Sequence, residues 1–207
     1  MILLERRLER FKKVIAKRQL DIAIVLENVH DKHNIGAVLR SCDSIGVQHV
    51  YIVNTDPRLQ NPEKYEQLST SSGAAKWITL HYFEDVDSAV KELRESIGTI
   101  ITTHLNSDSK SLYSIDFNSS FALVFGNEHE GVSDELLSHA DYNVVIPQKG
   151  MVQSLNISVA CAVCLFEIFR QRDEKAAYDQ PFNQNVLAQQ KLLEEWVEIH
   201  EASKRKI

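Results

Sequence analysis

The chain lacks the sequence features of membrane and secreted proteins. None of its apolar runs approaches the roughly 20 residues that are needed to cross a bilayer. Its N-terminus is rich in charged residues, where a secretory signal would be apolar. These absences predict a cytoplasmic protein that does not act in a membrane.

Cysteine is also scarce, with Cys42, Cys161 and Cys164 as the three examples. An odd number of cysteines in a chain without a secretory signal favours a reducing compartment. Cys161 and Cys164 have the CxxC spacing that can bind a metal or carry redox chemistry. Neither a second CxxC nor a histidine pair lies nearby, so packing inside a helical segment is the favoured interpretation and no metal is expected.

The chain has only seven glycines, and they do not form a GxGxxG or a P-loop. Such loops bring backbone N–H groups close to a phosphate, and they mark the common dinucleotide and nucleoside triphosphate sites. A generic nucleotide-binding α/β protein would need a loop of this kind. Its absence argues against that hypothesis.

Positive charge is sparse except at the chain's ends. The net charge is −6, but residues 1–18 carry seven basic and two acidic side chains, which leaves −11 on the other 189 residues. A basic segment on an acidic body suits local contact with a polyanion. A solvated helix face is the alternative interpretation. Candidate contacts for RNA in this segment are Arg6, Arg7, Arg10 and Lys13.

Short apolar runs alternate with helical periodicity along the chain. This alternation predicts an α/β fold with a mostly parallel sheet and a helix at each end. Predicted strands are 22–26, 49–53, 77–82, 99–103, 121–125 and 143–146, and predicted helices are 2–18, 34–45, 85–96, 133–139, 156–176 and 186–202.

Two polar loops follow predicted strands. Residues 27–47 hold Asn34, a possible helix cap, and Arg40, whose charge among apolar helix neighbours needs an anionic partner or substrate. Residues 121–137 hold Gly126, where a backbone can approach a ligand closely, and Glu128, which could orient a substrate or pair with Arg40. Ser133 is a plausible cap for the next helix. A surface arginine and an ordinary strand-to-helix turn remain the alternatives.

The segment 145–172 has the same character. A short apolar run ends at Pro147, a polar turn follows, and Ser154-Leu155-Asn156 precedes a long apolar helix. Such clusters between a strand and a helix are where α/β proteins build ligand sites. Taken alone, Ser154 or Asn156 could simply be a helix cap.

Together these three segments resemble the SpoU-type 2′-O-methyltransferases of the SPOUT superfamily, over about residues 20–172. The matching motifs are NxGAxxR at 34–40, GNExxG at 126–131 and IPxxGxxxSLNxSVA at 146–160. Within the family, the residues before SLN and the flanking helices are most similar to the branch that methylates the guanosine ribose at position 18 of the tRNA D-loop.

The resemblance implies a sheet whose C-terminal part threads a deep trefoil knot, with S-adenosylmethionine bound by the knot loops. By motif match, Thr103, Gly126, Ile146 and Leu155 would contact that cofactor, largely through backbone groups. The implied organisation is a basic helix (1–19), a methyltransferase domain (20–177) and a helical extension (178–207). A homodimer and tRNA are the implied partners, with Arg172 added to the RNA contacts.

The resemblance also implies the catalytic set Asn34, Arg40, Glu128, Ser154 and Asn156. In the family, the arginine matching Arg40 is the proposed base for the ribose hydroxyl, a demanding role for a group with a pKa above about 12. Holding a phosphate and stabilising the developing alkoxide are its other possible roles. A ribosomal RNA 2′-O-methyltransferase and a catalytically silent RNA-binding dimer remain the alternative functions.

Overall fold

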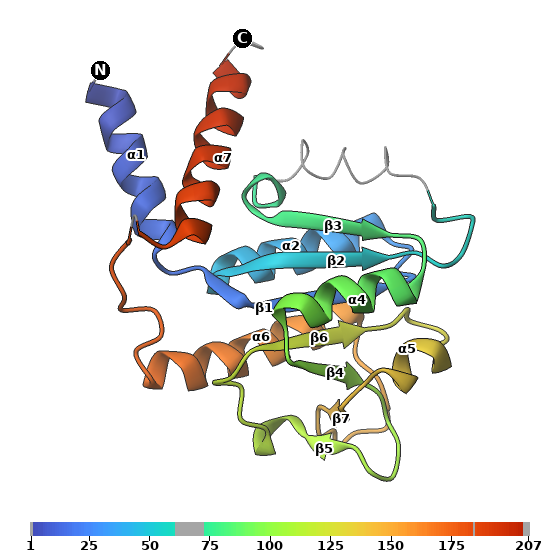
Figure 1. Cartoon of the computed structure of the whole chain (residues 1–207). Helices are drawn as coiled ribbons and strands as arrows, with labels where there is room; N and C mark the ends of the chain where they lie inside the picture. Colours follow the sequence, from blue (N-terminus) through green and yellow to red (C-terminus); the bar gives the residue numbers. More distant parts are fainter. Residues whose placement is uncertain (1, 61–72, 184, 205–207) are drawn as a thin grey trace.

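The protein is a seven-stranded parallel sheet with helices on both faces and a helix pair at one end (Figure 1). The computed structural model describes residues 2–60, 73–183 and 185–204. The strand order is β3-β2-β1-β6-β4-β7-β5, so the chain runs outward from β1 to β3 on one side, whereas on the other side β6 and β7 insert beside strands that precede them in the sequence. This confirms the predicted α/β class and the mostly parallel sheet.

The elements follow the predicted pattern closely. The strands are β1 (Gln19–Glu27), β2 (Val47–Val53), β3 (Thr79–Phe83), β4 (Thr99–Thr103), β5 (Lys110–Ser111), β6 (Phe121–Phe125) and β7 (Tyr142–Val145). The helices are α1 (Ile2–Ile15), α2 (Lys32–Ile45), α4 (Val86–Ser96), α5 (Asp134–Ser138), α6 (Ile157–Glu174) and α7 (Leu187–Lys204), with short 3-10 helices at Ala75–Trp77 and Leu112–Ser114.

Alternate side chains of the central strands enter two separate apolar layers. On one face, Ile22, Ile24 and Leu26 of β1 pack with α2 and α6. On the other face, Ala23 and Val25 pack with α4 and α5. Burial on both faces explains why these strands are continuous apolar runs and not alternating ones. Cys42, Cys161 and Cys164 are fully buried in the first layer, as the packing interpretation predicts.

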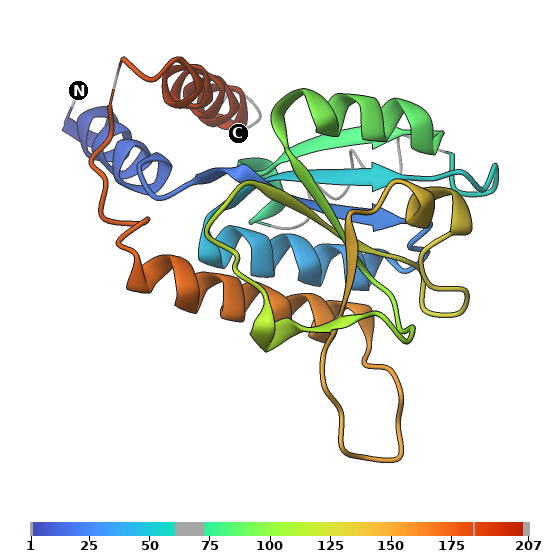
Figure 2. The ribbon, with the colours of Figure 1, turned by 60° about the horizontal axis from the view of Figure 1, so that its bottom comes forward.

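Helices α1 and α7 lie side by side and make a small core of their own (Figures 1 and 2). Phe11 and Ile15 of α1 pack against Leu192 and Trp196 of α7. The predicted three-part organisation, with boundaries at 19 and 177, stays a prediction. Among the described residues, no helix is both long enough and apolar enough to cross a membrane.

The C-terminal part of the sheet has an unusual insertion. β7 lies between β4 and β5, although β4 and β5 are consecutive in the chain. The following connection, residues 146–156, projects from the body as a long loop before α6 begins (Figure 2). This order is compatible with a threaded C-terminus, and the knot itself stays a prediction.

Candidate active site

The carboxyl ends of four neighbouring strands meet at one edge of the sheet. Leu26 of β1 pairs with Phe125 of β6, and Thr103 of β4 pairs with Val144 of β7. Because the strands are parallel, the loops that follow them emerge side by side. Residues that are far apart in the sequence therefore reach one place: the loops after Glu27, Thr103, Phe125 and Val145.

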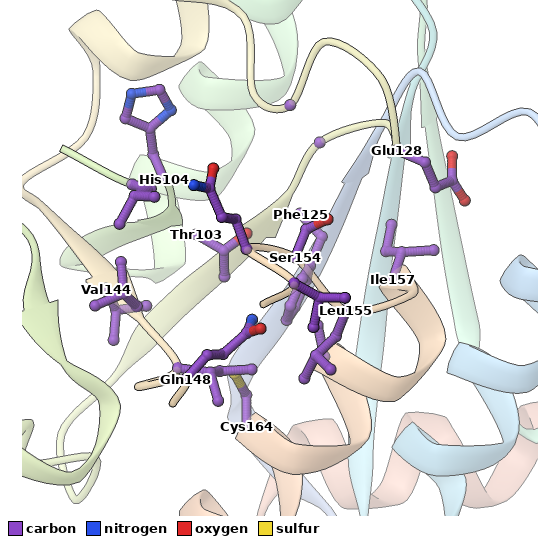
Figure 3. A pocket seen from close by; sticks show the side chains of 18 of the residues that line it. Thr103, His104, Phe125, Glu128, Val144, Gln148, Ser154, Leu155, Ile157 and Cys164 are labelled. Atoms are coloured by element: carbon purple, nitrogen blue, oxygen red, sulfur yellow. The ribbon is translucent and has the colours of Figure 1, made fainter. Parts of the chain in front are cut away.

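A pocket of about 710 Å³ opens at this edge. It lies within the usual size range of small-molecule sites, roughly 300–1,000 Å³. Figure 3 shows Thr103, His104, Gln148 and Leu155 around the hollow, with Glu128 set to one side. All four residues predicted to contact the cofactor line the pocket, namely Thr103, Gly126, Ile146 and Leu155. Glu128 and Ser154 line it as well.

The loop after β6 is held in a tight, fixed shape. Asn127 accepts hydrogen bonds on Oδ1 from the backbone N–H groups of His129 (2.8 Å) and Glu130 (2.7 Å). Gly131 adopts a positive φ of 74°, and a Cβ on Gly126 would lie 1.9 Å from the Gly131 carbonyl carbon. Both glycines are therefore required by the turn itself, which places its backbone along the pocket.

A buried carboxylate fixes the far end of this loop. Glu27 is 1% exposed, and its two oxygens accept hydrogen bonds from the N–H and the hydroxyl of Ser133. Ser133 also caps α5, as predicted, because its Oγ accepts the Leu136 N–H. Burial, the largest effect, raises the pKa of Glu27, while the bonds from Ser133 oppose that shift. Sequence reasoning missed Glu27, whose partner lies 106 residues away.

The pocket suits a ligand with positive charge. Among the residues that the structure describes, its lining holds two carboxylates, Glu128 and Glu130, and no lysine or arginine. Gln148 also lines the pocket, and its buried Oε1 has no hydrogen-bond partner among the described residues. An unpaired buried acceptor is costly, so it favours a ligand that donates a hydrogen bond. The residues present therefore fit S-adenosylmethionine, which carries a sulfonium, an ammonium and the adenine amino group.

Three predicted catalytic residues form one hydrogen-bonded chain beside the pocket. Asn34 donates through Nδ2 to Glu128 Oε1 at 2.7 Å. Asn156 donates through Nδ2 to Asn34 Oδ1 at 3.2 Å. The side-chain oxygen of Asn156, Oδ1, caps α6 by accepting the Ser158 N–H at 2.9 Å. Asn156 thus serves both as a cap and as a member of this chain.

Two expectations about α2 are wrong. The helix begins at Lys32 and is capped by Asp31, so Asn34 lies within the first turn and does not cap it. Its side chain is free to reach Glu128 for that reason. Glu128 does not pair with Arg40: Arg40 is exposed and makes no hydrogen bond or ion pair within the described part of the chain. Asn34, Arg40 and Asn156 lie outside the pocket lining.

The predicted RNA contacts divide into two groups. Arg6, Arg10 and Lys13 are exposed on α1, and Arg7 is half-buried beside Phe11. Arg172 is 4% exposed, and its guanidinium bonds Asp21 in a two-pronged pair at 2.8 and 3.0 Å. Further bonds go to Gln19 and to the carbonyls of Phe117 and Ser119. Arg172 therefore joins α6 to β1, and its prediction as an RNA contact is wrong.

Several pocket residues were not predicted from the sequence. His104 and Leu105 follow β4, and Gln148 and Gln153 lie in the loop before α6. The only signal for them is position, since each comes just after a strand or within the polar turn that precedes Ser154. Position alone does not distinguish a lining side chain from a solvated one.

Comparison with known proteins places this geometry in context. Residues 21–166 match the SpoU rRNA Methylase family. The tRNA (guanosine(18)-2′-O)-methyltransferase of Thermus thermophilus is 42% identical over 193 residues, covering 93% of this chain and 96% of that protein.

Solved structures of RNA-modifying enzymes also superpose on this chain. The TrmH/SpoU tRNA modifying enzyme of A. aeolicus superposes with a TM-score of 0.81 at 34% identity, covering 96% of this chain and 98% of that one. An AdoMet-bound rRNA methyltransferase from Sinorhizobium meliloti superposes at 0.61 with 28% identity, covering 72% of this chain and 56% of that one.

Proposed function

Because the chain belongs to the SpoU rRNA Methylase family, we propose that it transfers a methyl group from S-adenosylmethionine to a ribose 2′-hydroxyl of tRNA. The proposed target is the guanosine at position 18 of the D-loop, the substrate named for the Thermus relative. The observation that carries this proposal is the chain from Glu128 through Asn34 to Asn156 beside an acid-lined pocket.

Backbone and side-chain groups at the strand ends would hold the cofactor. Thr103, Gly126, Ile146 and Leu155 line the pocket, and the exposed Ser154 completes its rim. The two pocket carboxylates favour a cationic ligand by Coulomb attraction. When bound, the cofactor supplies an electrophilic methyl on sulfur, which leaves as the neutral thioether forms.

Arg40 is the residue on which we expect the chemistry to depend. A ribose hydroxyl is a poor nucleophile, and its oxygen gains negative charge as its proton passes to solvent water. Arg40 lies about 9 Å further along α2 than Asn34, and its guanidinium has no competing partner in the described residues. It is available to hold the phosphate beside the target ribose and to stabilise the developing alkoxide.

The hydrogen-bonded chain has a positioning role. Asn34 is fixed by Glu128 on one side and Asn156 on the other. Side chains held in this way lose little further freedom when a substrate binds. We expect them to align the hydroxyl with the methyl group, which supplies much of the rate.

A homodimer is the assembly we propose. Val159 and Phe166 are 48% and 55% exposed on α6, which is apolar on more than one face. Val152 and Met151 are exposed on the projecting loop before that helix. A second copy covering these side chains would remove an apolar surface from water. The proposed location is the cytoplasm, where unmodified tRNA is available.

A ribosomal RNA target is the second candidate, because the matched family and the Sinorhizobium enzyme both carry that description. The two targets separate in one experiment. Purified protein is incubated with labelled S-adenosylmethionine and either unmodified tRNA or unmodified ribosomal RNA. We expect label in tRNA alone. Label in ribosomal RNA alone would favour the second candidate, and none in either would favour a silent RNA-binding dimer.

A further inference from the structure

The helix pair α1–α7 contains a second cavity, far from the first. It has a volume of about 200 Å³ and is lined by residues from α1, the turn after it, α2, the segment around Trp77 and α7. In Figure 1, α1 and α7 stand at the end of the sheet where β1 begins, opposite the edge where the strands end. Its lining residues are Arg7, Arg10, Phe11, Val14, Arg18, Asp43, Trp77 and Trp196.

The charges in this cavity do not cancel. Within the described part of the chain, three arginines line it against a single acid, Asp43. That carboxylate is bound by Arg18 Nη2, so it is already committed to one guanidinium. Arg10 is exposed and makes no hydrogen bond or ion pair within the described ranges. An excess of positive charge therefore faces the cavity.

Buried donors in the cavity wall are unused. The side chain of Arg18 is 1% exposed, and its Nε has no hydrogen-bond partner among the described residues. The same holds for the buried Nε of Arg7. A buried N–H of a charged group without a partner is costly. Burial also lowers the pKa of Arg18, so a further anion would stabilise its charged form.

Aromatic rings hold these guanidinium groups in place. Arg18 lies 5.0 Å from the ring centroid of Trp196, and Arg7 lies 5.7 Å from that of Phe11. Trp196 also packs on Trp77 at 5.0 Å and is 3% exposed. Because its faces are covered, Trp196 cannot stack on a nucleobase. The cavity is therefore suited to a compact anion and not to a flat ring.

We propose that this cavity binds a backbone phosphate of the RNA substrate, at a distance from the nucleotide that is methylated. The proposal rests on the proposed function, since it takes RNA to be the substrate. Arg7, Arg10 and Arg18 together form the binding site for this phosphate. The contact is therefore local, and does not come from the positive charge of α1 as a whole.

The first test compares two variants that remove one exposed charge each. Arg10→Ala removes a cavity residue, whereas Lys17→Ala removes an exposed lysine that does not line the cavity. The affinity for an unmodified tRNA transcript is measured without cofactor over a range of salt concentrations. We expect Arg10→Ala to raise the Kd about fivefold and to reduce the slope of log K against log salt by about one. We expect Lys17→Ala to change the Kd less than twofold.

The second test uses inorganic phosphate as a probe. Thermal unfolding is followed with phosphate and with sodium chloride at matched ionic strength. We expect phosphate to raise the Tm of the unmodified chain more than that of Arg10→Ala, because a ligand of the folded state stabilises it.

The outcomes separate clearly. Equal effects of Arg10→Ala and Lys17→Ala on tRNA affinity would overturn the proposal in favour of diffuse charge. A phosphate effect without a tRNA effect would mean that a small phosphorylated compound is the ligand, and would also overturn it. Both tests measure binding alone, so normal tRNA binding without methyl transfer would contradict the proposed function and leave this site standing.

Discussion

The pocket at the strand ends and the cavity between α1 and α7 have opposite electrostatic character. Among the described residues, the pocket at the strand ends is lined by two glutamates and no lysine or arginine, whereas the cavity between α1 and α7 is lined by three arginines and one aspartate. The first suits a cationic cofactor and the second suits a polyanion. A net charge of −6 therefore does not exclude an RNA substrate. Positive and negative side chains lie in different regions, and a ligand responds to the charge near its own site.

The two regions are also built differently. Loops that follow parallel strands form the pocket, and tight turns such as 126–131 bring backbone groups to its wall. Helix side chains from the two ends of the chain form the other cavity. Substitutions should therefore affect cofactor binding, chemistry and RNA affinity separately.

The largest expected effect separates chemistry from cofactor binding. Arg40→Ala should lower the rate of methyl transfer by about 1,000-fold, because it removes the group that stabilises developing negative charge. Since Arg40 does not line the pocket, the affinity for S-adenosylmethionine should stay within twofold. Single-turnover assays and calorimetry measure the two quantities. Arg40→Lys, which keeps the charge but loses the planar fork, should be intermediate. Wild-type turnover in Arg40→Ala would overturn the site assignment.

A smaller effect concerns the hydrogen-bonded chain. Asn34→Ala and Glu128→Ala should each lower the rate about 100-fold, and the double variant should be little worse than either, since the residues act as a unit. Asn156→Ser is the informative companion, because serine keeps the cap of α6 but cannot reach Asn34. Its rate should fall while its Tm stays nearly constant. Fully additive losses in the double variant would show that the contact has no catalytic role.

Salt should distinguish the two cavities. Raising the salt concentration from 50 to 200 mM should weaken tRNA binding about 40-fold if the protein neutralises three phosphates, because the release of their counterions becomes less favourable as salt rises. The affinity for S-adenosylmethionine should change less than threefold over the same range, because its site is small and partly enclosed. Anisotropy and calorimetry provide the two values. A salt dependence of equal size for both ligands would contradict the division between the cavities.

The smallest expected effect comes from a histidine pair outside both cavities. His49 Nδ1 lies 3.1 Å from His81 Nε2, and burial, followed by the charge of His81, lowers the pKa of His49 to about 4. The unfolded chain therefore binds more protons than the folded chain between about pH 6.5 and pH 4, so stability should fall as the pH falls through that window.

We expect the free energy of unfolding to fall by about 1–2 kcal/mol because of this pair. This figure is smaller than the pKa shift alone would give, because the pair is partly exposed. Urea unfolding at several pH values measures it, and His49→Gln should flatten the dependence. A variant that kept the full pH dependence would assign the effect to other groups. The measurement also guards against mistaking acid unfolding for titration of the active site.

Most of the fold could be predicted, because buried parallel strands are apolar runs with clear boundaries. β5 could not, since Lys110 and Ser111 are polar and pair only with β7. The sequence predicts that α2 starts at Asn34, whereas the helix starts after Asp31, because both residue types cap helices well. Choosing between them depends on Glu128, which is 94 residues away.

The candidate site, like the fold, could be predicted only where local sequence carries the signal. Its motif residues were predicted because their order in the sequence resembles a known family, and the structure brings Asn34, Glu128 and Asn156 into contact. Arg172 looked like a surface charge at a helix end, yet its partner Asp21 lies 151 residues earlier. Such tertiary pairs leave no local signal, and the same is true of Arg18 with Asp43.

The most direct test of the central claim uses two tRNA transcripts that differ by one oxygen atom. One carries guanosine at position 18 of the D-loop, and the other carries 2′-deoxyguanosine there. We expect one methyl group per molecule on the first and none on the second, with similar affinities for both. Equal methylation of the two transcripts would contradict the account, because the acceptor could not then be that ribose hydroxyl.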